Sequence, residues 1–527
     1  MGQAELLILG LLVAVGGLSA LARLVRVPYP IVLVLAGAIV GFLPGLPEVR
    51  LDPEVVLVIF LPPLLYGSAI FANYNDLKEN LRGLTLSTVG LVLATMCGVA
   101  WAAHGLIDGM SWEAAFVLGA IVSPTDPLAA ATVMRQLNAP RRLVSGIEGE
   151  GLFNDATALV AYKVAVTAVV AGSFSLAHAG LDFLLGAAGG VAIGLLAGAV
   201  LAAVRRRVAD TDVNVTLSLL TGYAAYIPAD ALGVSGILAT VTAGIFVGIR
   251  APAILPTRAR LQGYFVWEIL DFIVNTILFV LVGLQLRTIV EGLDGYSAST
   301  LVGYGLAVSG VVVGVRLLWF FTMPYLIRML DRRPSQLARR LSPGARVVLV
   351  WSGMRGAVSL AIALALPLAT DTGDPFPYRD LIIFLTFAVI FFTLVVQGLT
   401  LPLLLRRLAI TDGGEADEEE VRARMAASKA ALEQIDALRG EEWTREETLE
   451  RMRGLYKYRK RRFAARAGKI EDDGYEDRSL AYQQVVQAVL EAQRGELLRL
   501  RSSGELSNES MIRILREIDL EEARLEI

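Results

Sequence analysis

The chain has 527 residues, of which 55% are hydrophobic, and its mean hydropathy is +0.58. This composition excludes an ordinary soluble globular protein and indicates that a lipid bilayer is the solvent for most of the chain. The formal net charge is only -3, but charged residues are sparse before residue 410 and dense after it. We therefore expect a membrane-embedded domain over residues 1–410 and a cytoplasmic helical domain over residues 411–527.

The residues that usually hold metals and cofactors are scarce. Cys97 is the single cysteine, and His104 and His178 are the two histidines, which we interpret as residues of the membrane interface. A zinc or haem site cannot be assembled from this inventory, and no phosphate-binding loop or enzymatic nucleophile is evident. We expect no cofactor, no nucleic-acid partner and no enzymatic activity.

Apolar runs long enough to cross a bilayer, which takes about 20 residues, occur about thirteen times. The first run has no basic segment before it, so we interpret it as a retained helix rather than a cleaved signal. The runs are Leu6 to Ala22, Tyr29 to Leu46, Val55 to Phe71, Leu84 to Ala103, Ala114 to Met134, Leu152 to Ala171, Leu181 to Val204, Val213 to Ile227, Gly233 to Ile249, Tyr264 to Leu286, Leu301 to Ile327, Val347 to Ala369 and Leu381 to Leu405.

Arginine and lysine gather in alternate loops between these runs. The basic loops include Arg205 to Arg207 and the cluster from Arg328 to Arg346, whereas the opposite loops offer only Arg50, Arg287 and Arg379. Because basic loops stay in the cytoplasm, we expect the amino terminus outside and the carboxyl terminus inside.

Ionisable residues within the apolar runs are where function is expected, since each is costly in lipid. They are Asp126, Glu150, Asp155, Lys163, Glu268, Asp271, Arg316 and Arg355.

The fifth run contains the motif SPTDPL, in which Pro124 and Pro127 bracket Thr125 and Asp126. Proline removes backbone donors, so we expect a broken helix whose free backbone groups line a cavity. Asp126 could simply cap the following half-helix, and capping is compatible with ion handling.

The twelfth run carries a counterpart, WSGMRGAVSL, in which Gly353 and Gly356 flank Arg355. Interruptions at matching places in two halves of a chain are typical of a transporter's central site. We therefore expect two inverted repeats of about six helices, with helices five and twelve broken and crossing. The alternative is that the glycines only permit close helix packing, although packing does not require a buried guanidinium.

The sixth run begins with EGEGLFNDATAL, which places Glu150 and Asn154 on one helix face with Asp155 beside them. Their oxygens could converge on the break in the fifth helix, where hard oxygen donors suit Na+, K+ or Li+. Burial raises a carboxyl pKa and nearby cations lower it, so a proton and a cation can compete for the same oxygens. If only the loaded carboxylate crosses the membrane, this competition produces exchange. The alternative for Asp155 is a structural ion pair with Lys163 or Arg355.

The tenth run, with Glu268 and Asp271, is interpreted as structural, and Glu268 could pair with Arg316. Lys163 is interpreted as a structural counter-charge rather than a ligand.

Taken in order, the segments LPPLLYGSA, SPTDPLAA, NDATAL, SGILATVTAGIFVG and GMRGAVSLA resemble the type 1 monovalent cation/proton antiporters, in particular the NhaP-like sodium/proton antiporters of bacteria. The resemblance covers essentially the whole chain. It implies a thirteen-helix fold with crossed, broken helices five and twelve, a homodimer, and a place in the bacterial plasma membrane.

The resemblance also implies roles for individual residues. Asp155 resembles the carboxylate that binds cation and proton in turn, and Asn154 resembles the neutral partner associated with electroneutral exchange. Thr125 and Glu150 match residues of the ion site. Asp126 matches the carboxylate of the helix break, and Arg355 the arginine that steadies the crossing.

One departure concerns Gly151, where the family often has a serine, so a hydroxyl ligand or donor is absent. This departure bears on which cation is selected and how tightly it binds. The resemblance implies Na+ as the substrate, with Li+ also accepted, whereas a K+/H+ antiporter would use the same chemistry. A cation channel or a membrane sensor is the rival from another class, but the two broken helices favour alternating access.

Overall fold

The computed structural model describes residues 16–17, 22, 24, 28–43, 53–79, 81–172, 176–293, 295–330, 341–410, 415–466, 470–471 and 474–523. The chain divides into two compact units, Met1–Thr411 and Asp412–Ile527. The first predicted span, Leu6 to Ala22, lies mostly outside the described residues.

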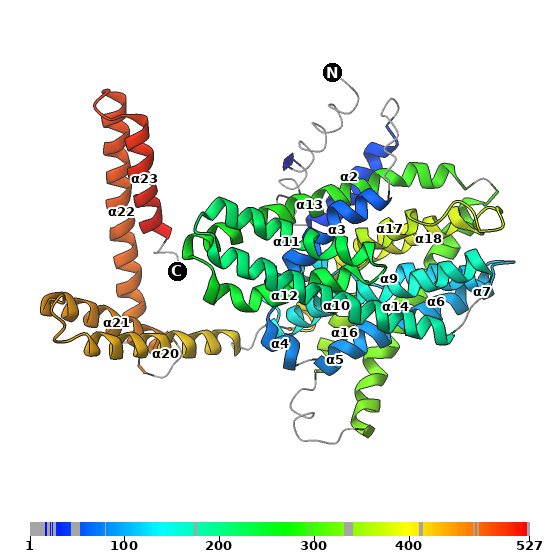
Figure 1. Cartoon of the computed structure of the whole chain (residues 1–527), viewed down its shortest axis with the longest axis horizontal. Helices are drawn as coiled ribbons and strands as arrows, with labels where there is room; N and C mark the ends of the chain where they lie inside the picture. Colours follow the sequence, from blue (N-terminus) through cyan, green and yellow to red (C-terminus); the bar gives the residue numbers. More distant parts are fainter. Residues whose placement is uncertain are drawn as a thin grey trace. The chain divides into compact units, whose positions relative to one another are not determined.

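The first unit is built from helices, with an isolated β-bridge between Ala369 and Pro375 (Figure 1). Its elements are α2 (Tyr29–Gly41), α3 (Pro53–Ile70), α4 (Tyr74–Glu79), α5 (Leu81–Thr85), η1 (Leu86–Leu91), α6 (Val92–Leu106), α7 (Trp112–Val122), α8 (Pro127–Gln136), α9 (Arg141–Ala171), α10 (Leu176–Arg207), α11 (Thr211–Ala231), α12 (Gly236–Ile254), α13 (Thr257–Glu291), α14 (Ala298–Leu330), α16 (Pro343–Trp351), α17 (Ala357–Leu364), α18 (Arg379–Phe392), η2 (Thr393–Gln397) and α19 (Gly398–Arg407), where η denotes a π-helical stretch.

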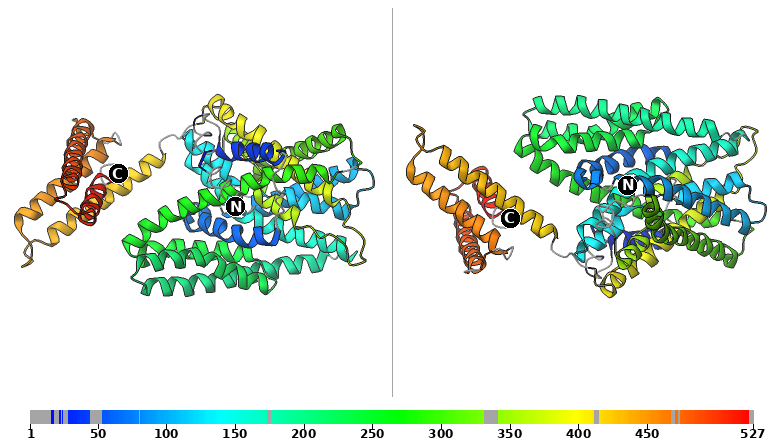
Figure 2. Two further views of the ribbon diagram at one scale, coloured as in Figure 1. Left: turned by 90° about the horizontal axis from the view of Figure 1, so that it is seen from above. Right: turned by 90° about the horizontal axis from the view of Figure 1, so that it is seen from below.

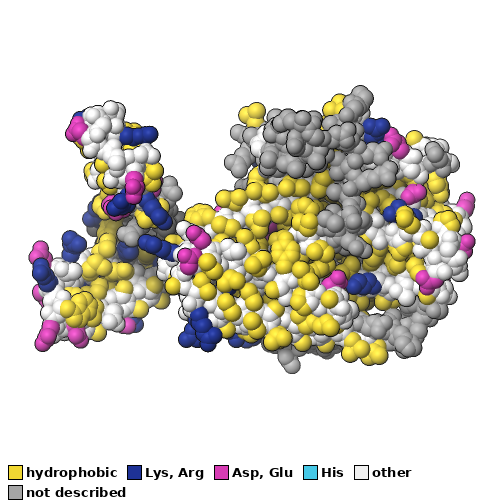
Figure 3. Space-filling view, turned by 45° about the horizontal axis from the view of Figure 1, so that its top comes forward, with side chains coloured by type: hydrophobic (Ala, Val, Ile, Leu, Met, Phe, Trp, Pro, Cys, Tyr) yellow, Lys and Arg dark blue, Asp and Glu magenta, His cyan; other side chains and the backbone are white. Residues whose placement is uncertain are grey.

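Within the described residues, eight helices are long and apolar enough to cross a membrane. These helices carry apolar side chains on their exposed faces as well as on their buried ones. For example, Trp101 is 73% exposed and Leu318 is 64% exposed. Figure 3 shows the corresponding surface of this unit, where hydrophobic side chains predominate over charged ones. Such a surface is stable only against lipid. The count of thirteen spans and the inverted repeat remain predictions.

Close helix packing depends on small residues on both sides of the contact between α2 and α13. A side chain at Gly37 of α2 would collide with the backbone of α13, and one at Gly283 of α13 would collide with α2. Without a hydrophobic force between helices in lipid, such backbone contact supplies much of the association energy. The helices of this unit run alongside one another, as the two views in Figure 2 show.

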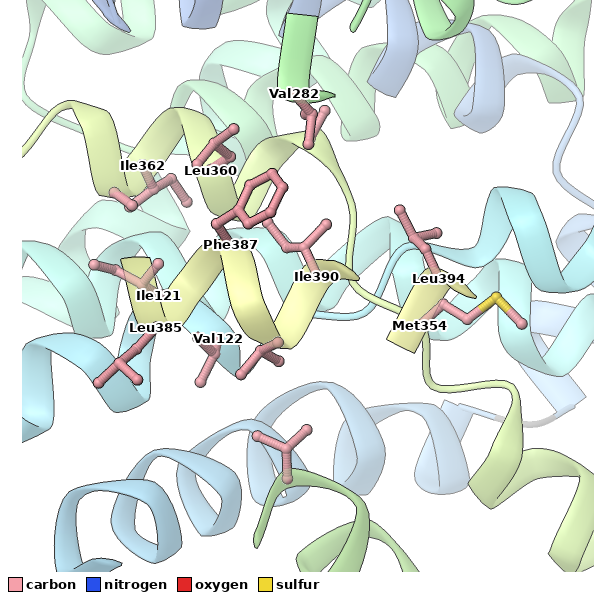
Figure 4. Packing of buried hydrophobic residues seen from close by; sticks show 14 of the residues in the cluster. Ile121, Val122, Val282, Met354, Leu360, Ile362, Leu385, Phe387, Ile390 and Leu394 are labelled. Carbon is pink, nitrogen blue, oxygen red and sulfur yellow. The ribbon is translucent and has the colours of Figure 1, made fainter. Parts of the chain in front are cut away.

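The core of the first unit surrounds the ends of the half-helices α7 and α17. Ile121 and Val122 of α7 pack with Leu360 of α17 and with Phe387 and Ile390 of α18 (Figure 4). All of these side chains are at most 3% exposed. This packing holds the last residues of α7 and the first turns of α17, and therefore positions the polar segment that follows α7 and the one that precedes α17.

The second unit consists of α20 (Glu415–Ala437), α21 (Glu446–Arg466), α22 (Tyr475–Ser502) and α23 (Asn508–Ala523). Leu490 of α22 and Met511 and Ile518 of α23 are buried, and these two helices pack against each other. Arg494 of α22 pairs with Glu522 and with Asp519 of α23, and the hydrogen bonds that Arg494 donates to these carboxylates raise its pKa. Apolar contacts and ion pairs thus hold this hairpin together.

Candidate functional site: two crossed helix breaks

The fifth predicted span is broken, as its two prolines predict. α7 ends at Val122 and α8 begins at Pro127, whose fixed φ suits the first position of a helix. Asp126 caps α8, because its Oδ1 accepts a hydrogen bond of 2.9 Å from the Leu128 amide. Both the break and the cap were predicted from the sequence.

The twelfth predicted span is broken as well. α16 ends at Trp351, α17 begins at Ala357, and Gly356 between them is extended. A side chain at Gly356 would overlap the carboxylate of Asp126, so the absence of a Cβ lets the two breaks touch. The amide of Asp126 donates to the carbonyl of Met354 at 2.8 Å. Each broken segment therefore satisfies a backbone group of the other, which is what burial in a membrane requires.

Arg355 holds this crossing through neutral partners. Its side chain is buried; Nε donates to the Val122 carbonyl at 3.1 Å and Nη1 donates to the Gly353 carbonyl. Its amide donates to Thr393 Oγ1 at 3.0 Å. Val122 is the last residue of α7, so the guanidinium meets the negative end of that helix dipole. The structure gives Arg355 no ion pair with Asp155 among the described residues.

A buried ion pair joins α9 to α14. Glu150 and Arg316 are 4% and 1% exposed, and Arg316 Nη1 and Nη2 donate to Glu150 Oε1 and Oε2 at 2.5 and 3.2 Å. Arg316 Nε also donates to the Leu349 carbonyl at 3.0 Å. The predicted pairing of Arg316 with Glu268 is wrong, because Glu268 is exposed on α13. Spacing along one helix places a charge on a face but does not show which helix lies opposite.

Thr125, in the break of the fifth span, is bound from two sides by α9. Its hydroxyl donates to Glu150 Oε1 at 2.9 Å. The Asn154 amide nitrogen donates to the Thr125 hydroxyl at 2.8 Å and to its carbonyl at 3.0 Å. Asn154 is 1% exposed, and its Oδ1 has no hydrogen-bond partner among the described residues. A buried acceptor oxygen therefore remains available beside the break.

Asp155 is the residue after Asn154 in α9, and its side chain is half-buried. Within the described part of the chain it makes no ion pair or hydrogen bond, and its carboxylate lies within electrostatic range of Asp126. Lys163 does not neutralise it, since Lys163 Nζ lies 3.9 Å from Asp230 Oδ1 and both side chains are more than half exposed. Asp155 and Asn154 Oδ1, which have no hydrogen-bond partner among the described residues, are therefore acceptors to which a proton or a hard cation could bind.

Some features were not predicted from the sequence. One is the partner of Glu150, which is Arg316, more than 160 residues away in the chain. Another is the reason why residue 151 is a glycine. A Cβ at Gly151 would lie 2.5 Å from Cδ of Pro127, so the space where a serine would stand is occupied by the broken helix. Asp271 on α13 accepts a hydrogen bond of 3.0 Å from Asn275 and lies within electrostatic range of Asp126.

Comparisons with known proteins agree with this architecture. Residues 10–407 match the family model described as sodium/hydrogen exchanger, transmembrane. An uncharacterised Na+/H+ exchanger of Mycobacterium tuberculosis is 34% identical over 98% of this chain and 97% of its own length. The sodium, potassium, lithium and rubidium/H+ antiporter of Bacillus pumilus is 34% identical over 76% of this chain and 61% of its own length.

A solved structure shares the fold. The sodium proton antiporter MjNhaP1 from Methanocaldococcus jannaschii at pH 8 superposes with a TM-score of 0.60 and 18% sequence identity, over 77% of this chain and 99% of that one. The family model covers three quarters of the chain. The chain therefore belongs to the sodium/hydrogen exchanger family and is a multi-pass membrane transporter, a monovalent cation/proton antiporter rather than an enzyme.

Proposed function

We propose that the protein exchanges Na+, and also Li+, for H+ across the bacterial plasma membrane by alternating access, with cation and proton competing for Asp155. The observation that carries this proposal is a pair of acceptor groups beside the crossed breaks, Asn154 Oδ1 and the Asp155 carboxylate, to which no described residue donates a hydrogen bond. Such oxygens bind a hard cation or a proton, and cannot bind both fully at once. K+/H+ exchange is the alternative, supported by the name of the Bacillus pumilus relative.

The supporting residues have distinct parts in this mechanism. Glu150 is held by Arg316 and Thr125, so in this conformation it fixes the break rather than offering free oxygens. Direct cation binding by Glu150 or Thr125 stays a prediction. Asp126 and Arg355 hold the crossing, around which one part of the membrane unit would move against the other. Because Asn154 is neutral, Asp155 alone would carry the exchanged charge, which favours one-for-one, electroneutral exchange.

The arrangement in the cell is proposed as follows. The amino terminus lies outside and the second unit lies in the cytoplasm, as the basic loops indicate. Residues 1–410 form the antiporter domain with two inverted repeats, and the molecule is a homodimer.

The test is proton movement in proteoliposomes that carry a pH gradient, with Na+, Li+ or K+ added in turn. The native protein and Asp155→Asn are compared with Glu268→Gln, which makes the same change at an exposed position of α13. We expect Na+ to dissipate the gradient with the native protein and with Glu268→Gln, and Asp155→Asn to be inactive although correctly folded. Competition also predicts that the half-saturating Na+ concentration rises as the pH falls.

Other outcomes have clear meanings. A response to K+ alone would establish the alternative substrate. Normal exchange by Asp155→Asn, or no response to any cation, would refute the mechanism and favour a channel or a sensor. A rate that changes with an imposed membrane potential would overturn the electroneutral stoichiometry.

A further inference from the structure

An ion pair away from the crossed breaks joins two helices that belong to different groups. Lys163 of α9 and Asp230 of α11 lie with Nζ and Oδ1 3.9 Å apart. α9 packs mainly against α7 and α8, the two halves of the broken fifth span, whereas α11 packs mainly against α10 and α12. The pair therefore bridges the helices around the first break and a second group of helices. Nothing in the proposed cation site uses it.

The pair lies at one face of the membrane unit. The side chains of Lys163 and Asp230 are 56% and 52% exposed, and Asp230 stands in the last turn of α11. Charged side chains that face lipid are costly, so these two face water. α9 begins at Arg141 and α11 begins after Arg205 to Arg207, so both helices start beside basic loops. In the proposed orientation they end at the outer face.

A stripe along α9 connects this face with Asp155. Asp155 lies eight residues before Lys163, which is about 12 Å along a helix axis. Steps of four residues place Asp155, Leu159 and Lys163 on one side of α9. Exposure increases along the stripe, because Asp155 and Leu159 are half-buried whereas Lys163 and Thr167 are exposed. The stripe is therefore a route from the outer face toward the proposed cation site.

Apolar side chains stand between the ion pair and Asp155 on this route. Leu159 packs on the buried cluster that includes Tyr226 of α11. Leu159 is one turn before Lys163 in its helix, and Tyr226 is one turn before Asp230 in the other. The order along the route is therefore carboxylate, apolar layer and ion pair. In this conformation the ion pair is the first charged group that a cation from the outer face would meet.

We propose that Lys163 and Asp230 form an electrostatic gate at the outer mouth of the path to Asp155; this inference rests on the proposed cation exchange. Asp230 attracts an incoming cation, whereas Lys163 repels it and neutralises Asp230 while the pair is made. An exposed pair at 3.9 Å is weak, so it opens readily when the two groups of helices move apart. The two residues therefore set the apparent affinity for the cation at this face and are not ligands of the bound cation.

The test measures the rate of exchange against Na+ concentration in right-side-out membrane vesicles, where Na+ is added at the outer face. Lys163→Gln leaves Asp230 unpaired, so the half-saturating Na+ concentration should fall about threefold. Asp230→Asn leaves Lys163 unpaired, so the same concentration should rise about threefold. A charge about 12 Å away would change it about twofold in bulk water and about tenfold at an effective dielectric constant of about 20. Raising the ionic strength with choline chloride should reduce both shifts, because salt screens exposed charges.

Three controls accompany these variants. Glu291→Gln breaks another exposed ion pair, in which Arg287 Nε and Glu291 Oε1 are 2.7 Å apart near the end of α13, and it should behave like the native protein. The charge swap, Lys163→Asp together with Asp230→Lys, restores a pair and should return the half-saturating concentration to near the native value. In everted vesicles, where Na+ is added at the opposite face, both single variants should differ little from the native protein.

Several results would overturn the gate. Unchanged half-saturating concentrations, or shifts in the same direction in Lys163→Gln and Asp230→Asn, would leave the pair as a structural contact, because a structural loss does not depend on the sign of the charge that remains. Equal shifts in right-side-out and everted vesicles would place the effect on Asp155 itself. Native exchange with unshifted variants would refute the gate alone, whereas no exchange by the native chain would refute the proposed function and the gate with it.

Discussion

The buried pair of Glu150 and Arg316 gives a quantitative prediction. The side chains of Arg316 and Glu150 are 2% and 6% exposed, and two hydrogen bonds join them, so bulk solvent has little access to replace a lost partner. Glu150→Gln would leave the guanidinium charge buried against a neutral amide, and Arg316→Gln would leave the carboxylate. Each change should lower the free energy of unfolding by about 3–5 kcal/mol, the cost of an uncompensated buried charge.

The double variant should be less damaged than either single one. Two glutamines can hydrogen-bond to each other without any buried charge, so we expect a coupling energy of at least about 2 kcal/mol in a double-mutant cycle. The measurement is denaturant unfolding of the purified protein in detergent, followed by tryptophan fluorescence. The control is Lys163→Gln, which breaks an exposed pair at 3.9 Å and should cost less than about 1 kcal/mol. Additive losses in the double variant would refute the reasoning.

Two further predictions concern glycines at the crossing. Gly356→Ala should displace the Asp126 carboxylate and slow exchange at least about tenfold, which corresponds to an increase of about 1.4 kcal/mol in the activation barrier. Gly310→Ala, whose Cβ would meet open space, is the control and should be active. Equal activity of the two variants in the proteoliposome assay would contradict this prediction. Gly151→Ser and Gly151→Ala should both lower stability by about 1–3 kcal/mol, because either Cβ meets Pro127. If the serine variant alone shows a lower half-saturating Na+ concentration, the added hydroxyl acts as a ligand. If the melting temperature of both variants equals that of the native protein, the neighbouring helix moves aside and the prediction is wrong.

The positions of the helix breaks could be predicted from the sequence because their causes are local. Pro124 and Pro127 remove backbone donors whatever surrounds them, and Asp126 is suited to cap the helix that follows. Helical spacing placed Glu150 and Asn154 on one face of their own helix, and the structure shows both bound to Thr125 in the first break. Motif order also indicated the family, which the comparisons confirm.

Partners across helices could not be predicted in this way. Arg316 was paired with Glu268, because both were charges within apolar runs, but helix neighbours are decided by packing over the whole unit. Lys163 was considered a partner for Asp155, yet it lies on an exposed face near Asp230. Periodicity specifies the angle of a side chain about its own helix and nothing about the helix opposite.

The sequence by itself determined that this chain is a membrane protein, where its helices break, and which carboxylates lie within its apolar runs, since hydropathy, proline and charge act through local physics. Only the tertiary structure decided that Arg316 neutralises Glu150 and that Gly356 and Gly151 leave room for the neighbouring break. It also decided that Asn154 Oδ1 and Asp155 receive no hydrogen bond from the described part of the chain. These features depend on contacts between residues far apart in the chain, and such contacts exist only after the helices have packed.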